Sequence, residues 1–150
     1  MHLTTFTDYS LRVLIYVAAH REGRATIGDV ARAFGISGNH LTKVVHFLGK
    51  QGFLANVRGR GGGLELAVPA REINIGDVVR QAEGTTGPVE CFDSATNTCV
   101  LTRACGLRRM LAESMHAFYR VLEQYTLEDL VHDRPPLARI LFTPGMAPAP

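Results

Sequence analysis

The sequence lacks any apolar run near the roughly 18 residues that a membrane-spanning helix requires. No segment near its start resembles the apolar region of a secretion signal, so we expect an intracellular chain with no membrane partner. Cysteine is scarce, with three residues among 150. An odd number cannot all pair in a closed disulfide framework, so the composition predicts reduced thiols.

All three cysteines, Cys91, Cys99 and Cys105, lie within one short stretch with the spacing C-x7-C-x5-C. The first two lie in a segment (84–102) rich in Gly, Thr, Pro, Asn and Ser, and the third opens a helical pattern. Neither gap matches the about two to four residues between ligands in zinc knuckles, whereas iron–sulfur clusters accept wider spacing. The spacing predicts an iron–sulfur cluster; zinc and three free thiols remain alternatives.

The net charge of +2 is unevenly distributed. Residues 1–71 contain nine Lys/Arg and four Asp/Glu, a charge of +5, whereas residues 72–150 contain seven and ten, a charge of −3. A basic first half indicates a polyanionic partner, with the acidic second half kept away from it. The length suits one compact domain, or a DNA-binding head joined to a small second module.

The first half follows the order helix, helix, turn, helix, hairpin. An amphipathic pattern over 11–18 predicts the first helix, with Thr7 or Asp8 as its cap. Thr26 and Asp29 resemble a capping box for a short second helix, which Gly35 ends. Ser37 would then cap a third helix with an apolar face of Leu41, Val44, Val45 and Leu48. This order is typical of a helix-turn-helix.

Two short alternating segments, 53–57 and 64–68, predict strands that flank the sequence RGRGGG at 58–63. A basic hairpin after a helix-turn-helix predicts a winged helix, whose arginines can neutralise phosphates or enter a minor groove. A nucleotide-binding loop is the alternative, but no Lys-Ser/Thr pair follows. In the third helix, Asn39 and His40 are candidates for base contacts, and Thr42 and Lys43 for backbone contacts. The predicted DNA-binding residues are Ser37, Asn39, His40, Thr42, Lys43, Arg58, Arg60 and Gly61.

The second half predicts a short helix over 75–82 and the longest helical pattern of the chain over 105–125. Little sequence remains to cover the apolar stripe of that long pattern, which favours a symmetric dimer with two DNA-binding heads for a palindromic operator. Shorter helices are expected at 127–131 and 137–142. The predicted organisation is a winged helix-turn-helix domain (1–72), a cluster-binding loop with dimerisation helices (73–142) and a Pro-rich disordered tail (143–150).

Several segments resemble the nitric-oxide-sensing repressors among the winged-helix iron–sulfur regulators. They are LTTFTDY at 3–9, VRGRGGG at 57–63, IGDVVR at 75–80, the three cysteines and YTLEDL at 125–130. The resemblance covers about residues 1–142. It implies a mainly α fold with a small hairpin wing and a long C-terminal dimerisation helix. It also implies a cytoplasmic bacterial homodimer that represses nitric-oxide-detoxification genes while its cluster is intact. Nitrosylation or loss of the cluster would release the operator.

Three cysteines with one different fourth ligand suit a 4Fe-4S cluster, with 2Fe-2S as the alternative. Other candidates for the fourth ligand lie closer in sequence. Glu90 and Asp93 are near Cys91, but Glu90 directly adjoins it, so the Glu90 side chain tends to point away from the same iron. His116 lies about 16 Å along the helix from Cys105, which is too far. Asp8 lies in the family-like segment at 3–9, and in a dimer it can reach the partner's cysteine loop. Asp8 of the partner subunit is therefore the predicted fourth ligand; the alternative is that Asp8 only stabilises its own helix N-terminus.

Two other functions remain open from the residues. One is a regulator that works by thiol–disulfide exchange without a cluster. The other is a cysteine-dependent enzyme with His116 or His132 as the base. No sequence feature orients such a cysteine–histidine pair, so the sequence predicts a regulator and not an enzyme.

Overall fold

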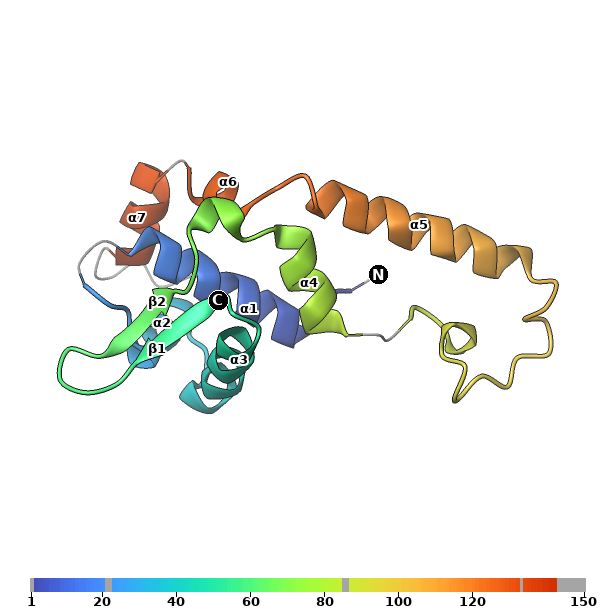
Figure 1. Ribbon diagram of the computed structural model, residues 1–150, viewed down its shortest axis with the longest axis horizontal. Coiled ribbons are helices and arrows are strands. Elements are labelled where there is room, and N and C mark those ends of the chain that lie inside the picture. Colours follow the sequence, from blue (N-terminus) through green and yellow to red (C-terminus); the bar gives the residue numbers. More distant parts are fainter. Residues whose placement is uncertain (1, 21–22, 85–86, 133, 143–150) are drawn as a thin grey trace.

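The computed structural model describes residues 2–20, 23–84, 87–132 and 134–142. Within these ranges the chain is mainly helical, with one antiparallel pair of strands (Figure 1). In chain order the elements are α1 (Thr5–Ala19), α2 (Ile27–Phe34), α3 (Gly38–Lys50), β1 (Leu54–Val57), β2 (Gly63–Leu66), the 3-10 helix η1 (Ala70–Glu72), α4 (Ile75–Glu83), the 3-10 helix η2 (Glu90–Phe92), α5 (Gly106–Leu122), α6 (Leu127–Val131) and α7 (Arg134–Phe142).

Two regions differ in shape, and we call them the head and the arm. The head comprises residues 2–84 and 126–142, in which α1 packs against α3, α4, α6, α7 and β2. The arm comprises residues 87–125, where α5 extends away from the head and the preceding loop lies alongside it (Figure 1). The predicted boundary at residue 72 falls in η1, yet the core continues past it through Ile73, Val78 and Val79, which are fully buried.

The helix-turn-helix is built by the local signals that the sequence contains. Thr26 and Asp29 form the predicted reciprocal capping box, which confirms that prediction. Gly35 ends α2 with a φ of +65°, a left-handed conformation that glycine adopts without steric cost. The Ser37 hydroxyl accepts from the His40 amide and caps α3. The predicted inner face of α3 is confirmed, because its four aliphatic residues are at most 4% exposed: Leu41, Val44, Val45 and Leu48.

The start of α1 differs from the prediction. Thr4, not Thr7 or Asp8, caps the helix, because the Thr4 hydroxyl accepts from the Thr7 amide at 3.2 Å. Thr7 is instead fully buried inside the first turn. The helix therefore begins earlier than its apolar pattern indicates, since the polar residues of its first turn still have helical backbone.

The hairpin forms as predicted, but its buried face is not the predicted alternation. Leu54 pairs with Leu66, and Val57 pairs with Gly63. Leu54 and Leu64 are buried, whereas Ala55, Val57 and Leu66 are only half-buried. Leu54 and Leu64 face the head, and Leu64 also pairs with Ala25 in the connection between α1 and α2, so contacts with other parts of the chain decide which strand residues are buried.

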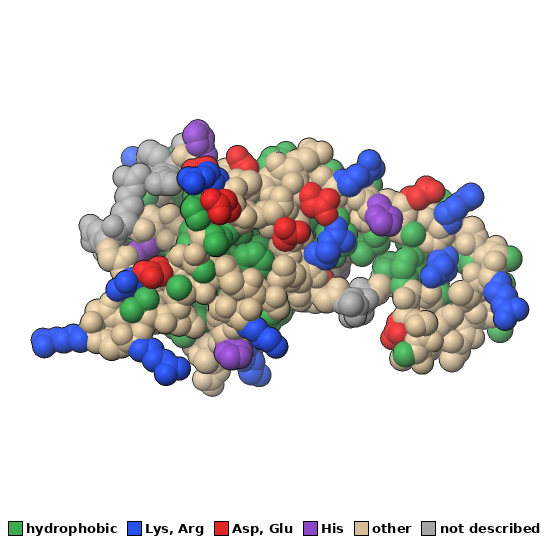
Figure 2. All heavy atoms as spheres, viewed as in Figure 1, with side chains coloured by type: hydrophobic (Ala, Val, Ile, Leu, Met, Phe, Trp, Pro, Cys, Tyr) green, Lys and Arg blue, Asp and Glu red, His purple; other side chains and the backbone are tan. Residues whose placement is uncertain are grey.

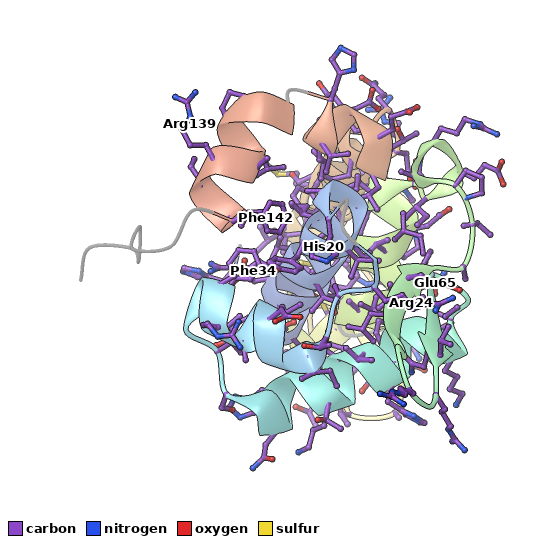
Figure 3. The ribbon with its side chains drawn as sticks, turned by 90° about the vertical axis from the view of Figure 1, so that its left-hand side faces the viewer. His20, Arg24, Phe34, Glu65, Arg139 and Phe142 are labelled. Atoms are coloured by element: carbon purple, nitrogen blue, oxygen red, sulfur yellow. The ribbon has the colours of Figure 1, made fainter. Side chains whose placement is uncertain are left out.

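The C-terminal helices follow the predicted order with shifted ends. Cys105 occupies the N-cap position of α5, and the helix stops at Leu122 rather than near Tyr125. Thr126 and Asp129 form a second capping box, which starts α6 and forces a turn before it. Helix α7 returns to α1, and Figure 3 shows Phe142 near His20 of α1. The Phe142 ring also meets the Tyr16 ring edge to face, with 5.1 Å between the ring centroids. The predicted tail, 143–150, lies outside the described residues. No helix in the described ranges is long and apolar enough to cross a membrane.

Candidate nucleic-acid interface and thiol loop

Helix α3 presents a polar outer face while its inner face is fixed in the core. The ring of Phe47 also packs edge to face on Phe6 of α1 at 5.1 Å, so α3 cannot roll without breaking buried contacts. The Thr42 hydroxyl donates to the Gly38 carbonyl at 2.9 Å and keeps an acceptor lone pair free. All the predicted α3 contacts are solvent-exposed: Ser37, Asn39, His40, Thr42 and Lys43.

The wing, residues 54–66, extends from the side of the head that carries α3. Its tip is a tight glycine-rich turn. The Gly62 amide donates to the Gly59 carbonyl at 2.9 Å, and a Cβ at Gly62 would collide with the Val57 carbonyl oxygen. Only glycine fits at that position. The predicted contact residues Arg58, Arg60 and Gly61 are exposed, and neither arginine forms an ion pair with another residue of the described ranges.

Charge is separated over this surface. No acidic residue occurs between Asp29 and Glu65, a stretch that contains all of α3 and the wing tip. Figure 2 shows Lys and Arg side chains projecting from the wing and from the lower edge of the head, while acidic side chains gather above them. A surface with one sign of charge attracts a polyanion at long range.

A groove of about 540 Å³ runs between the start of α2, the outer side of α3 and the strands. The groove joins the two predicted contact elements into one surface. Its lining includes hydroxyl, amide and imidazole groups from three elements: Thr26, Thr42, His46 and Asn56.

The pKa of Asp29, which bonds to the groove residue Thr26, lies below its usual value. The main cause is the hydrogen bond that the Thr26 hydroxyl donates to its carboxylate at 2.6 Å. The nearby Arg32 guanidinium acts in the same direction. The carboxylate therefore stays ionised at neutral pH and keeps the capping box of α2 intact.

The three cysteines lie in the arm as free, half-buried thiols. Their loop is ordered by local hydrogen bonds: the Asn97 side chain accepts from the Cys99 amide at 3.1 Å, and the Cys99 carbonyl accepts from the Thr102 hydroxyl at 2.7 Å. Arg108 of α5 donates to the Cys91 carbonyl at 3.1 Å. The backbone on both sides of the thiols is thus held while the thiols themselves remain unpaired by disulfides.

Asp93, one of the acidic residues next to the thiols, is engaged in its own turn. Its carboxylate accepts from the Ala95 amide and the Thr96 hydroxyl, each at 2.9 Å. These bonds, led by the one from the Ala95 amide, lower the pKa of Asp93. The side chain therefore organises the loop and has few acceptor positions left for a metal.

The donor set fits an iron–sulfur cluster in its chemistry. Three cysteine thiols within one segment are the kind of ligand that such clusters take. The structure does not gather them: within the described ranges, no group of three or more His, Cys, Asp or Glu side chains is close enough to hold a metal ion. The cysteines are therefore on one loop but not yet in one ligand sphere.

Asp8, the predicted fourth ligand, lies in the first turns of α1 in the head. Its carboxylate pairs with Arg12 one turn later at 2.9 Å, and both side chains are more than 40% exposed. Asp8 is thus available to a partner chain, although its ion pair with Arg12 must then be shared or released.

Sequence reasoning missed several pairs that tie distant segments together. The Thr4 amide donates to Glu83 at 2.7 Å, which fastens the start of α1 to the end of α4. Arg80 of α4 pairs with Glu123 and lies over the Tyr119 ring at 4.1 Å. Both partnerships join residues more than 35 positions apart, and no local pattern marks them.

A helix-turn-helix with an exposed second helix, α3, followed by a basic hairpin, defines a winged-helix DNA-binding protein. The model of the family described as "Rrf2: Iron-dependent Transcriptional regulator" matches residues 3–133. The chain belongs to the Rrf2 family of transcriptional regulators, and this membership confirms the winged-helix fold and the prediction that the protein is a regulator rather than an enzyme.

The chain is also similar to curated transcriptional regulators named NsrR. The chain is 46% identical over 142 residues to the HTH-type transcriptional regulator NsrR of Bacillus subtilis (strain 168), covering 94% of this chain and 97% of the relative. It is 49% identical to the NsrR of Geobacillus kaustophilus (strain HTA426) with the same two coverages. These relatives confirm the resemblance of residues 1–142 to this group of regulators.

The fold has solved counterparts. The structure of T. potens IscR aligns with a TM-score of 0.71 at 25% identity, covering 91% of this chain and 90% of that chain. The structure of CymR, the global cysteine regulator of B. subtilis, aligns with a TM-score of 0.68 at 28% identity, covering 89% and 98%. Both are similar to this chain over head and arm together.

Proposed function

We propose that this protein is a cytoplasmic, homodimeric repressor whose iron–sulfur cluster senses nitric oxide. With the cluster bound, two heads occupy a palindromic operator; reaction with nitric oxide releases the DNA and derepresses nitric-oxide-detoxification genes. The observation that carries the proposal is the combination of a basic winged-helix surface with three free thiols on one loop of the arm. The match to an iron-dependent family and to relatives named NsrR supports it.

The thiolates of Cys91, Cys99 and Cys105 would hold the cluster, in 4Fe-4S form, with Asp8 of the partner subunit as fourth ligand. Bound there, the cluster supplies iron that reacts with nitric oxide. Because an oxygen ligand binds iron more weakly than a thiolate does, the Asp8 carboxylate would be the protein ligand that a small molecule displaces. Release of Asp8 would restore its full ion pair with Arg12.

A continuous set of contacts links the thiol loop to the DNA-binding surface. Arg108 holds the Cys91 carbonyl to α5, and the Arg80–Glu123 pair holds α5 to α4. Glu83 then fastens α4 to Thr4 at the start of α1, and Phe6 packs on Phe47 of α3. In the proposed switch, ordering of the loop biases the position of α5 and, through these contacts, the two recognition helices.

The dimer would form along α5. Leu107, Met110 and Val121 are 61%, 62% and 54% exposed on that helix, and a run of such residues in water favours a second apolar surface. Two heads held by paired arms would present their α3 helices to successive major grooves of one operator.

The proposal is tested with protein purified without oxygen and an operator duplex selected from a random-sequence pool. Native mass spectrometry should show a 4Fe-4S cluster for each chain, and fluorescence anisotropy should show tight binding that nitric oxide abolishes. Replacing each cysteine by Ala should remove the cluster and weaken operator binding at least about tenfold, equivalent to about 1.4 kcal/mol.

Ser94→Ala is the matched control, because it changes the same loop at an exposed side chain that bonds to no described residue. It should keep both the cluster and the affinity. A colourless wild type whose DNA binding responds to reductant alone would establish the thiol–disulfide alternative. A cysteine variant that lacks the cluster yet binds the operator fully would break the proposed coupling.

A further inference from the structure

Arg24 holds the wing from outside the hairpin. It lies in the connection between α1 and α2, 41 residues before Glu65 of β2. Its Nε donates to the Glu65 Oε2 at 2.8 Å, and its Nη1 donates to the Gly61 carbonyl at 3.4 Å. Figure 3 shows the two labelled side chains, Arg24 and Glu65, side by side at the wing. One guanidinium therefore bonds to both a strand and the tip.

The backbone beside Arg24 joins the hairpin as well. Ala25 pairs with Leu64, and the Leu64 amide donates to the Ala25 carbonyl at 2.7 Å. A Cβ on Gly63 would lie 2.6 Å from that carbonyl oxygen and 2.8 Å from the Arg24 Cβ, closer than packed side chains approach. The hairpin is thus pressed against residues 24–25, and that segment sets its direction along with the two strands.

The negative charge of Glu65 lies next to the proposed DNA-binding surface, where an unpaired carboxylate would oppose DNA binding. Glu65 ends the long stretch without acidic residues and follows Arg58 and Arg60, the two wing arginines without an ion pair in the described ranges, by seven and five positions. A bare carboxylate there opposes the approach of phosphates. The Arg24 guanidinium neutralises the Glu65 carboxylate at hydrogen-bond distance, so the pair contributes little net charge to the surface. Its effect on DNA binding must then come from the position in which it holds the wing.

We propose that Arg24 and Glu65 form a latch that positions the wing tip. The latch presents Arg58 and Arg60 to DNA in a fixed direction, which reduces the ordering required on binding. Arg24 is a positioning residue, because it acts through Glu65 and the Gly61 carbonyl. The inference rests on the proposed DNA-binding function and names a determinant of it that lies outside both the recognition helix and the wing.

The test compares Glu65→Gln, Arg24→Gln, Arg24→Lys and the double Gln variant. Operator affinity is measured by anisotropy over a range of salt concentrations, and hydrogen exchange of the Gly62 amide is measured in the free protein. Each Gln variant should weaken binding about two- to fivefold, as expected for one exposed ion pair, and the double variant should be no weaker than Arg24→Gln. Arg24→Lys should restore part of the loss, and Gly62 exchange should accelerate in Glu65→Gln.

The sign of the Glu65→Gln effect is diagnostic, because loss of a negative charge alone should tighten DNA binding. Glu72→Gln is the control, since Glu72 pairs with its neighbour Arg71 in η1 and not with the wing. Exchange of the Gly62 amide in Glu72→Gln should match wild type.

Tighter DNA binding by Glu65→Gln, with unchanged exchange of the Gly62 amide, would overturn the latch. Unchanged Gly62 exchange, with a salt slope lowered by about one in Arg24→Gln, would make Arg24 a phosphate contact instead. A wild type that binds no duplex would refute the proposed function, while Gly62 exchange would still decide the latch.

Discussion

The head and the arm are stabilised in different ways. Nearly all buried apolar residues of the described ranges belong to the head; within 87–125 only Tyr119 is buried. The arm instead exposes Val100 at 95% and several apolar residues of α5. The head therefore has a core of its own, whereas the arm lacks one in a single chain and depends on something added: a second arm, a cluster, or both.

This difference separates two tasks. A DNA-binding surface must keep its shape to distinguish sequences, and the packed α1–α3 interface provides that rigidity. A sensor must have two states of similar free energy, and a loop with few buried contacts and local hydrogen bonds provides that freedom. The few side-chain bonds that join the two regions, such as Arg80–Glu123, are where one can influence the other.

The largest expected effect tests the claim that only the head has a core. Leu48→Ala removes a fully buried side chain of α3 and should lower the free energy of unfolding by about 2–5 kcal/mol. Met110→Ala, in the arm, should change that free energy by less than about 0.5 kcal/mol but weaken the dimer. Urea unfolding and analytical ultracentrifugation measure the two effects. Equal destabilisation by both substitutions would remove the distinction between the regions.

The next effect concerns specificity in the head. Asn39→Ala and His40→Ala should each cost about 1–3 kcal/mol of discrimination at one base pair if these side chains touch base edges. Binding to operator variants, each with one altered base pair, measures this loss. Lys43→Ala serves as the comparison, because a phosphate contact should weaken all duplexes alike. Uniform weakening by the first two variants would reassign them to the DNA backbone.

A smaller effect is expected at the wing tip. Arg58→Ala and Arg60→Ala should each reduce the steepness of log affinity against log salt concentration by about one. The reason is that binding of each variant releases about one counterion fewer from the DNA. Arg71→Ala is a suitable control, because Arg71 lies in η1 beyond the wing and is paired with Glu72. If neither wing variant changes the slope, the wing does not contribute phosphate contacts.

The smallest effect depends on pH and tests how the head holds α2. The folded-state pKa of Asp29 lies below its usual 3.8. The ionised Asp29 carboxylate therefore stabilises the folded protein at pH values above the unfolded-state pKa. This stabilisation is lost as the pH falls through the lower folded value. Thr26→Val removes the hydroxyl that is the main cause, costs about 1 kcal/mol at neutral pH, and should flatten the acid-side slope contributed by Asp29. Thermal unfolding between about pH 2 and pH 6 measures the slope; an unchanged slope in Thr26→Val would assign it to another carboxylate.

Much of the head was predictable because its signals are local. The capping box at Thr26, the break at Gly35 and the cap at Ser37 each act within four residues, so their geometry follows from neighbouring sequence. The errors arose where packing decides. The buried side of the hairpin depends on which residues meet α3, and the end of α5 depends on the turn that precedes the capping box at Thr126.

The candidate site divides in the same way. The spacing of the cysteines and the basic tip were visible in the sequence, and so was the exposed polar side of α3. The Arg24–Glu65 pair and the Thr4–Glu83 bond were not, because residues 41 and 79 positions apart meet only after the chain folds. In the sequence, nothing distinguishes these residues from other exposed polar or charged residues.

Residue types at short spacing were enough to specify the helix-turn-helix, the wing and the three thiols in one segment. The central place of α1, the support of the wing by residues 24–25, and the extension of the arm with its apolar side in water are visible only in the folded chain. Such features arise from contacts between distant segments, and their free energies depend on the packing of the whole fold rather than on any local pattern.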